Sequence, residues 1–135
     1  MNETIARMQA AMNRHDADGM AACFAPDYRS EQPAHPNRGF GGSGQVAANW
    51  SQMFEGVPDL VSDVIAHTTD GRTTWTEWDW HGHHVDGSVF AMRGVTLMGL
   101  NDEGLIAWAR LYMEPVEQDG AAIEETVQQL SQVRR

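Results

Sequence analysis

Apolar side chains recur at helical spacing in three segments of the first half of the chain. They follow one another every three or four positions over residues 2–14, over residues 17–24 and in the segment that follows Ser43, a period typical of amphipathic helices. Asp16 precedes the second segment and Ser43 the third. A side-chain oxygen at such a place can accept hydrogen bonds from the exposed amides of a first helical turn. A short extended run over residues 28–32 leads into a loop rich in proline and glycine.

After Pro58 the pattern becomes that of strands. Four long runs rich in β-branched and aromatic residues are separated by short turn sequences such as Asp70-Gly71, which predicts an antiparallel meander. These runs cover residues 60–69, 73–81, 88–101 and 105–116. Helices followed by strands predict an α+β fold in which the helices pack on the sheet.

The last part of the chain has a helical pattern of its own. Ile123, Val127 and Leu130 share one helical face, so this stretch is expected to pack on the domain or on a partner subunit. We therefore divide the chain into a single domain over residues 1–118 and a C-terminal helical tail over residues 119–135.

Charge and composition exclude several classes of function. The chain has 19 acidic and 9 basic residues and a net charge of −10, and every basic residue is an arginine. Without lysine there is no lysine Schiff base and no phosphate-binding lysine. Without a basic patch, neither a nucleic-acid partner nor a membrane partner is expected. The single cysteine, Cys23, allows no intrachain disulfide and is expected on the buried face of the second helix. No signal peptide or membrane-spanning run is evident, so a cytoplasmic location is expected.

Several short motifs, taken in order, resemble landmarks of a known fold family. They are Asn13 to Gly19, Phe24 to Asp27, Gly41-Gly42, Asn101 to Ile106 and Arg110 to Glu114. Over residues 3–116 the chain resembles the nuclear transport factor 2-like superfamily, which includes SnoaL-like and ketosteroid isomerase-like proteins. The resemblance implies a cone-shaped fold with N-terminal helices packed on a curved antiparallel sheet, a pocket between them, and commonly a homodimer. It selects no function, because this fold carries isomerases, cyclases, dehydratases, epoxide hydrolases and non-catalytic binding domains.

Alternation along the strands predicts which side chains face that pocket. In the second run, Thr76, Trp78 and Trp80 share the more apolar face, which we place inward. The inward positions of the third and last runs are Phe90, Met92, Gly94, Thr96, Met98, Ala109, Leu111 and Met113. Tryptophans and thioethers on one concave surface favour an apolar, cyclic ligand, although such stripes are also typical of a filled core. The predicted ligand contacts are Met8, Met12, Tyr28, Gln32, Trp50, Phe54, Trp78, Trp80, Met92, Thr96, Met98, Leu111 and Met113.

Three catalytic patterns of the superfamily are not matched. The base, the tyrosine and the aspartic acid of ketosteroid isomerases would fall on Gln32, Met8 and Thr96, which cannot take over those roles. The Arg-Asp-Asp set of limonene epoxide hydrolases would fall on Trp78, Trp80 and Leu111. The acid of SnoaL-type cyclases would also fall on Leu111. The standard forms of these activities are therefore not expected.

Glu31 is the remaining candidate for acid–base chemistry. It lies on the strand that carries polar site residues in two of these enzyme families, and a carboxylate desolvated among tryptophans holds its proton to a higher pH, which suits proton transfer. His35, four residues later, can partner it. The two families disagree on whether Glu31 or Gln32 faces the pocket. An exposed glutamate with an unrelated loop histidine is the alternative.

A cluster of histidines offers the only metal-like pattern. His81, His83 and His84 stand close to Asp86, but they fall at a predicted hairpin turn, and no further converging ligand is evident, so no physiological metal site is expected. Arg93 is expected on the outward face, in a cross-strand ion pair or a dimer contact.

The sequence leaves more than one function open. The first is binding of a small apolar metabolite of polyketide, terpenoid or steroid character, with cofactor-free isomerisation, cyclisation or dehydration as its catalytic form. In that form Glu31 is the base, and Tyr28, Gln32, His35 and Thr96 orient the substrate. The alternatives are a non-catalytic protein that carries or senses a ligand and a dimerising accessory protein with a filled core. No cofactor is implied, and the expected partners are a small apolar molecule and a second copy of the chain.

Overall fold

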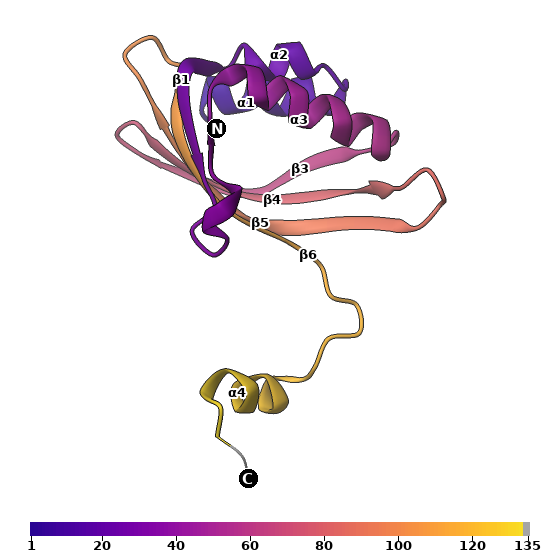
Figure 1. Ribbon diagram of the computed structural model, residues 1–135. Coiled ribbons are helices and arrows are strands. Elements are labelled where there is room, and N and C mark those ends of the chain that lie inside the picture. The colour runs from indigo at the N-terminus through magenta and orange to yellow at the C-terminus, as the bar shows by residue number, and fades with distance from the viewer. Residues whose placement is uncertain (134–135) are drawn as a thin grey trace.

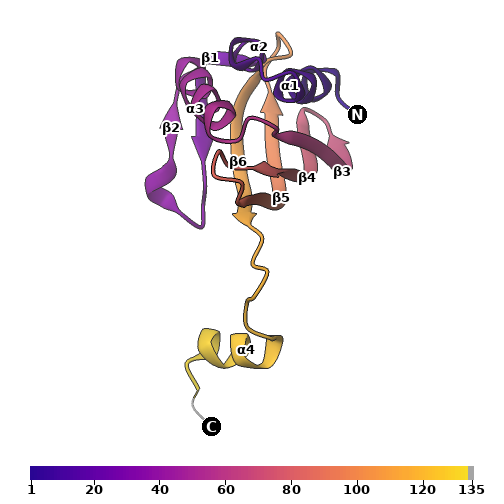
Figure 2. The ribbon, with the colours of Figure 1, turned by 90° about the vertical axis from the view of Figure 1, so that its right-hand side faces the viewer.

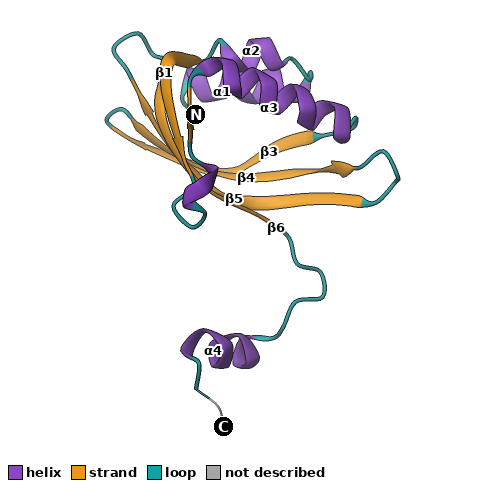
Figure 3. Cartoon of the chain, viewed as in Figure 1, coloured by secondary structure: helices purple, strands orange, loops and turns teal. Residues whose placement is uncertain are grey.

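The computed structural model describes residues 1–133 and shows three helices lying across one face of a curved sheet (Figures 1 and 3). The helices are α1 (Glu3–Asn13), α2 (Ala17–Ala21), α3 (Ser43–Gly56) and α4 (Ile123–Ser131), with a short 3-10 helix, η1, at Pro36–Arg38. The strands are β1 (Phe24–Glu31), β2 (Phe40–Gly41), β3 (Val61–Asp70), β4 (Thr73–His83), β5 (Val89–Leu100) and β6 (Ile106–Pro115). The predicted α+β fold, with its N-terminal helices on a curved sheet, is confirmed.

The sheet has the strand order β2-β1-β6-β5-β4-β3. Strands β3 to β6 form the predicted antiparallel meander. In addition, β1 pairs in parallel with β6, and β2 pairs antiparallel with β1. Bulges interrupt the pairing in β3 and at the start of β6, and such irregularities increase the local twist of a sheet. Strands β1 and β2 lie beside α3 at one side of the sheet (Figure 2).

The second helix ends earlier, and the first strand begins earlier, than the sequence predicted. α2 stops at Ala21 and β1 starts at Phe24, because the amide of Ile106 in β6 donates to the carbonyl oxygen of Cys23 (2.9 Å) and joins this segment to the sheet. Cys23 is buried as predicted, but it lies in the turn after the helix and not on the helix itself. Burial raises the pKa of its thiol, which fits a packing role.

The two predicted helix caps differ in outcome. The carboxylate of Asp16 accepts a hydrogen bond from the amide of Gly19 (2.9 Å) and caps α2 as predicted. This hydrogen bond, followed by one from Arg14, lowers the pKa of Asp16. Ser43, in contrast, is the first residue of α3, and the capping position belongs to Gly42, whose φ of 92° places it in the region that favours glycine.

The inward and outward faces of the strands are as the alternation predicted. Trp78 is fully buried, and Thr76, Thr96 and Met113 are also buried against the helices. On the opposite, outer face, Trp75 is 47% exposed. The inward face of the sheet therefore supplies a large part of the buried core.

The C-terminal helix α4 lies apart from the domain, at the end of an extended segment (Figures 1 and 2). Ile123, Val127 and Leu130 are all exposed, Leu130 to 80%. Of the two places expected for this helix, packing on its own domain is therefore wrong. No helix within residues 1–133 is both long and apolar enough to cross a membrane.

Candidate functional site

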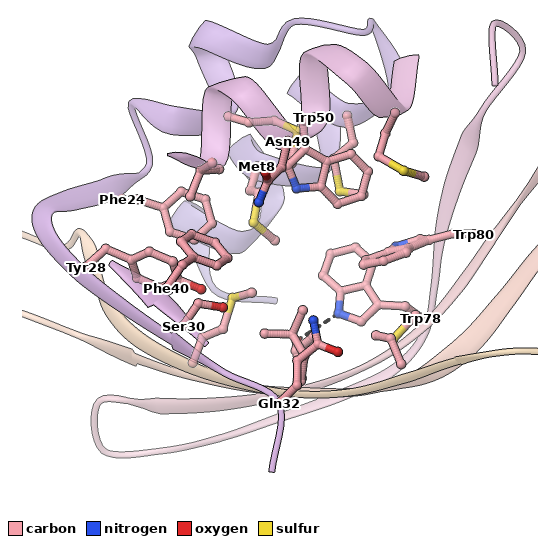
Figure 4. Close-up of a pocket in the computed structure, with 18 of the residues that line it drawn as sticks. Met8, Phe24, Tyr28, Ser30, Gln32, Phe40, Asn49, Trp50, Trp78 and Trp80 are labelled. Carbon is pink, nitrogen blue, oxygen red and sulfur yellow. Dashed lines mark hydrogen bonds between the residues drawn. The ribbon is translucent and has the colours of Figure 1, made fainter. Parts of the chain in front are cut away.

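A cavity of about 240 Å³ lies between the concave face of the sheet and the helices (Figure 4). Every element of the domain except β3 contributes to its wall. Its lining consists of Met8, Met12, Met20, Phe24, Tyr28, Ser30, Gln32, Arg38, Phe40, Val46, Asn49, Trp50, Met53, Trp78, Trp80, Met92, Thr96, Met98, Leu111 and Met113. The wall is mainly aromatic rings and thioethers, which offer large apolar area and adapt to ligand shape.

The structure brings together all the predicted ligand contacts except Phe54. The Phe54 ring packs against Trp50 (ring centroids 5.7 Å apart) and stacks on His15 at 4.6 Å. One helical turn separates Phe54 from Trp50, so it shares the inward face of α3. The face of the Phe54 ring is covered by His15, and Phe54 does not line the cavity.

Sequence reasoning missed part of the lining. The missed residues are Met20, Phe24, Ser30, Arg38, Phe40, Val46, Asn49 and Met53. Val46 and Met53 were on the predicted apolar face of α3, so their helical spacing was a sufficient signal. Arg38 and Phe40 had no local signal. They reach the cavity because the loop folds back and Phe40 pairs with Ser30 of β1.

Tryptophan rings form one side of the cavity. The ring of Trp50 meets that of Trp80 edge to face, with centroids 5.1 Å apart, and Trp80 lies 6.0 Å from Trp78. The Nε1 of Trp78 donates to the Oγ1 of Thr96 (2.9 Å), and both side chains are buried. The Nε1 of Trp80 is buried and has no acceptor within residues 1–133. This side is therefore apolar. The indole N–H of Trp78 has an acceptor in the protein, whereas that of Trp80 has none within the described residues.

A second aromatic group faces the tryptophans across the cavity. The ring of Tyr28 packs edge to face on Phe24 at 4.6 Å and on Phe40 at 6.0 Å. Burial raises the pKa of Tyr28 to about 12, so its hydroxyl is neutral at physiological pH and can donate a hydrogen bond. Figure 4 shows Gln32 between the two aromatic sides, with its side chain rising into the cavity.

The polar groups at the mouth of the cavity are held by neighbouring donors. The Nη1 of Arg38 donates to the Oε1 of Gln32 (3.1 Å). The Nε2 of Gln45 donates to the Oδ1 of Asn49 (2.6 Å). Arg38 is the only charged residue in the lining that the structure describes.

Glu31 and His35, the predicted catalytic pair, lie outside this cavity. Tyr28 and Ser30 face inward, so the alternation of β1 turns Glu31 to the outer face, beside Arg110 of β6. The prediction that Glu31 is desolvated among tryptophans is wrong, because its side chain is exposed. The Nε2 of His35 lies 2.5 Å from the Oε1 of Glu114, so the histidine pairs with another carboxylate. Between the two alternatives left open by the sequence, Gln32 is the residue that faces the pocket.

The histidine cluster is divided among different partners. His83 contacts the carboxylate of Asp59 (2.7 Å), and its hydrogen bonds lower the pKa of that aspartate. His81 lies 3.3 Å from Asp63, while the ring of His84 meets that of Phe90 edge to face. No group of three metal-ligating side chains is assembled anywhere within residues 1–133.

The outer face of the sheet carries the predicted cross-strand ion pair. Arg93 donates to Asp79 (3.0 Å), its direct neighbour on β4. The Arg93 side chain is well exposed, so this pair contributes little to stability.

Comparison with known proteins places this geometry in a family. A family model described as a SnoaL-like domain matches residues 5–109. A candidate SnoaL-like polyketide cyclase from Jannaschia sp. CCS1 is similar in structure, with 24% identity and a TM-score of 0.70 over 83% of each chain. AclR from Streptomyces galilaeus has 15% identity and a TM-score of 0.74, covering 96% of this chain and 90% of its own.

A third similar structure holds a ligand. RV0760c from Mycobacterium tuberculosis was crystallised with estradiol-17β-hemisuccinate, and it has 20% identity and a TM-score of 0.70, covering 86% of this chain and 92% of its own. At these identities the structural likeness shows the fold alone. By sequence, no curated protein matches the chain.

Proposed function

The chain belongs to the SnoaL-like domain family, and from this premise we propose that it binds a small, largely apolar ring compound of polyketide, terpenoid or steroid character in the cavity of Figure 4. The observation that carries the proposal is the enclosed wall of tryptophan and methionine side chains. Flat aromatic faces and flexible thioethers suit a rigid apolar body. The steroid ester held by RV0760c supports a ring compound as the ligand class.

We propose that the protein binds its ligand without catalysing proton transfer. Isomerisation, cyclisation and dehydration need a group that takes a proton near the substrate. Within residues 1–133, the cavity lining contains no carboxylate and no imidazole. The side chains of Tyr28, Gln32 and Thr96 can orient a ligand by hydrogen bonds. A protein that carries or senses a ligand needs no more than this.

We also propose that the chain acts as a homodimer. The outer face of the sheet exposes Trp75 and Tyr112, each to nearly half of its area, and α4 exposes a row of apolar residues. Exposed apolar surface of this kind is typical of a contact with another protein. Sedimentation velocity on the full chain measures the oligomeric state directly, and a single monomeric species would contradict the homodimer proposal.

Quenching of tryptophan fluorescence tests the binding proposal. We would titrate the protein with estradiol, camphor and anthraquinone, which represent the three ligand classes, and compare Trp50→Phe with Trp75→Phe. Trp50 lines the cavity, whereas Trp75 lies on the outer face. At least one ligand should quench the wild-type protein and Trp75→Phe, with a smaller amplitude in Trp50→Phe.

Glu31→Gln is a second control for the position of the site, because Glu31 lies outside the cavity. Its affinity for the same ligands should equal that of the wild-type protein. The binding proposal is abandoned if none of the three compounds changes the fluorescence of any of these proteins.

A further inference from the structure

The mouth of the cavity presents hydrogen-bond donors almost exclusively. Arg38 has five N–H donors and no acceptor, and its Nη1 already binds the Oε1 of Gln32. Because a guanidinium can only donate, it fixes which end of the Gln32 amide it contacts. The oxygen is taken by Arg38, and the NH2 group is left as a free donor beside the cavity.

The amide of Asn49 follows the same pattern on the opposite wall. Its Oδ1 accepts the hydrogen bond from Gln45, which leaves the Asn49 NH2 group available. Both amides of the lining therefore have their oxygens occupied by the protein. No acceptor for either NH2 group is found within residues 1–133.

The charge at the mouth has the same sign as these donors. Arg38 is a single positive charge in the lining of a chain whose net charge is −10, and no lining carboxylate within the described residues neutralises it. Its side chain is exposed, so it is solvated in the free protein. A solvated guanidinium carries no desolvation cost in the free protein, and it can donate hydrogen bonds to an acceptor group of a ligand.

Resting on the proposed function, we propose that the ligand is a ring compound that carries a carboxylate, which Arg38 and the NH2 group of Gln32 bind at the mouth of the cavity. The planar fork of a guanidinium matches the two oxygens of a carboxylate, and hydrogen bonds to an ionised acceptor are stronger than neutral ones. The ring body lies deeper, between the tryptophans and the Tyr28 side. Gln32 sits where the two parts join, since its side chain rises between the aromatic walls (Figure 4).

The test compares two ring probes of nearly the same shape, one a carboxylate anion and the other a neutral carboxamide. Binding of naphthalene-2-carboxylate and naphthalene-2-carboxamide is measured by isothermal titration calorimetry. The wild-type protein should bind the carboxylate about tenfold more tightly, a modest preference because the ion pair is exposed to solvent. Raising the salt concentration should weaken binding of the carboxylate and leave binding of the amide nearly unchanged.

Two arginine variants locate the effect. Arg38→Gln should abolish the preference, because it weakens binding of the carboxylate probe far more than binding of the amide probe. Arg29→Gln makes the same change of charge on the outer side of β1 and should keep the preference. Gln32→Glu replaces the free donor by a carboxylate, and it should bind the carboxylate probe less tightly than the amide. Equal melting temperatures show that the variants are folded.

The outcomes separate this proposal from the one on which it rests. Equal affinity of the wild-type protein for both probes, or an unchanged preference in Arg38→Gln, overturns the carboxylate assignment while ring binding stands. Absence of binding by both naphthalene probes and by the three ring compounds above removes the proposed function, and the carboxylate assignment with it.

Discussion

Replacing Thr96 with valine should destabilise the domain, although the two side chains have nearly the same shape. The Oγ1 of Thr96 accepts the hydrogen bond from the Nε1 of Trp78 (2.9 Å), and both side chains are almost completely buried. Valine leaves the indole N–H buried and unsatisfied. The expected cost is about 1–3 kcal/mol, the range for an orphaned buried polar group.

The neighbouring Thr76 provides a matched control. Thr76 lies directly opposite Thr96 on β4 and is equally buried, but its Oγ1 has no hydrogen-bond partner within the described residues. Thr76→Val therefore removes a buried polar group that was already unsatisfied, and it should leave the stability unchanged or raise it. The same chemical change on adjacent strands should therefore lower the free energy of unfolding at Thr96 but not at Thr76.

Urea unfolding, followed by circular dichroism, measures both variants against the wild-type protein. A cost of 1 kcal/mol corresponds to a decrease of about 4 °C in the melting temperature of a domain of this size, so a thermal scan resolves the effect as well. Equal free energies of unfolding for Thr96→Val and Thr76→Val would refute the reasoning, because it rests entirely on which hydroxyl has a partner.

Two further predictions concern the backbone and pH. Gly94→Ala should cost about 1–3 kcal/mol by overpacking, because a Cβ there would overlap the carbonyl oxygen of Tyr112 and lie 2.8 Å from the Cα of Met113. Gly44→Ala, where a Cβ meets nothing within 4 Å, is the control in thermal unfolding, and equal melting temperatures would contradict the clash. The folded protein holds Tyr28 neutral up to a pKa of about 12, whereas the unfolded chain ionises near pH 10. The stabilisation present below pH 10 is therefore lost as the pH rises towards 12, by about 1.4 kcal/mol per pH unit. Urea unfolding between pH 9 and pH 12 should show a smaller decline for Tyr28→Phe than for Tyr112→Phe, and the same decline in both variants would count against this cause.

The strand faces could be predicted because alternation is a local property. Trp78, Trp80 and Leu111 were placed towards the helices from alternation and from the apolar character of their faces, and the structure puts them there. The end of the second helix could not be predicted in this way. The signal for β1 to begin at Phe24 lies in Ile106, more than eighty residues later.

Whether Glu31 or Gln32 faces the pocket also depends on contacts with a distant part of the chain. Only the pairing of β1 with β6 decides which side of the strand faces the helices. The position of Arg38 at the cavity depends on the pairing of its loop with β1, which Phe40 and Gly41 make. An arginine in a loop rich in proline and glycine carries no sign that it will stand at the mouth of a pocket.

The parallel pairing of β1 with β6 also governs when the binding site can exist. The strand that bears Tyr28 and leads to Gln32 joins the sheet by pairing with Ile106 and the residues after it, so this part of the cavity wall is held by the last strand of the sheet to be synthesised. In a nascent chain, the three covering helices are synthesised long before the sheet that they cover is complete. Joining segments so distant in sequence is a slow step in folding. Since a ligand of this cavity binds only the finished sheet, its presence would raise the population of folded domains by mass action.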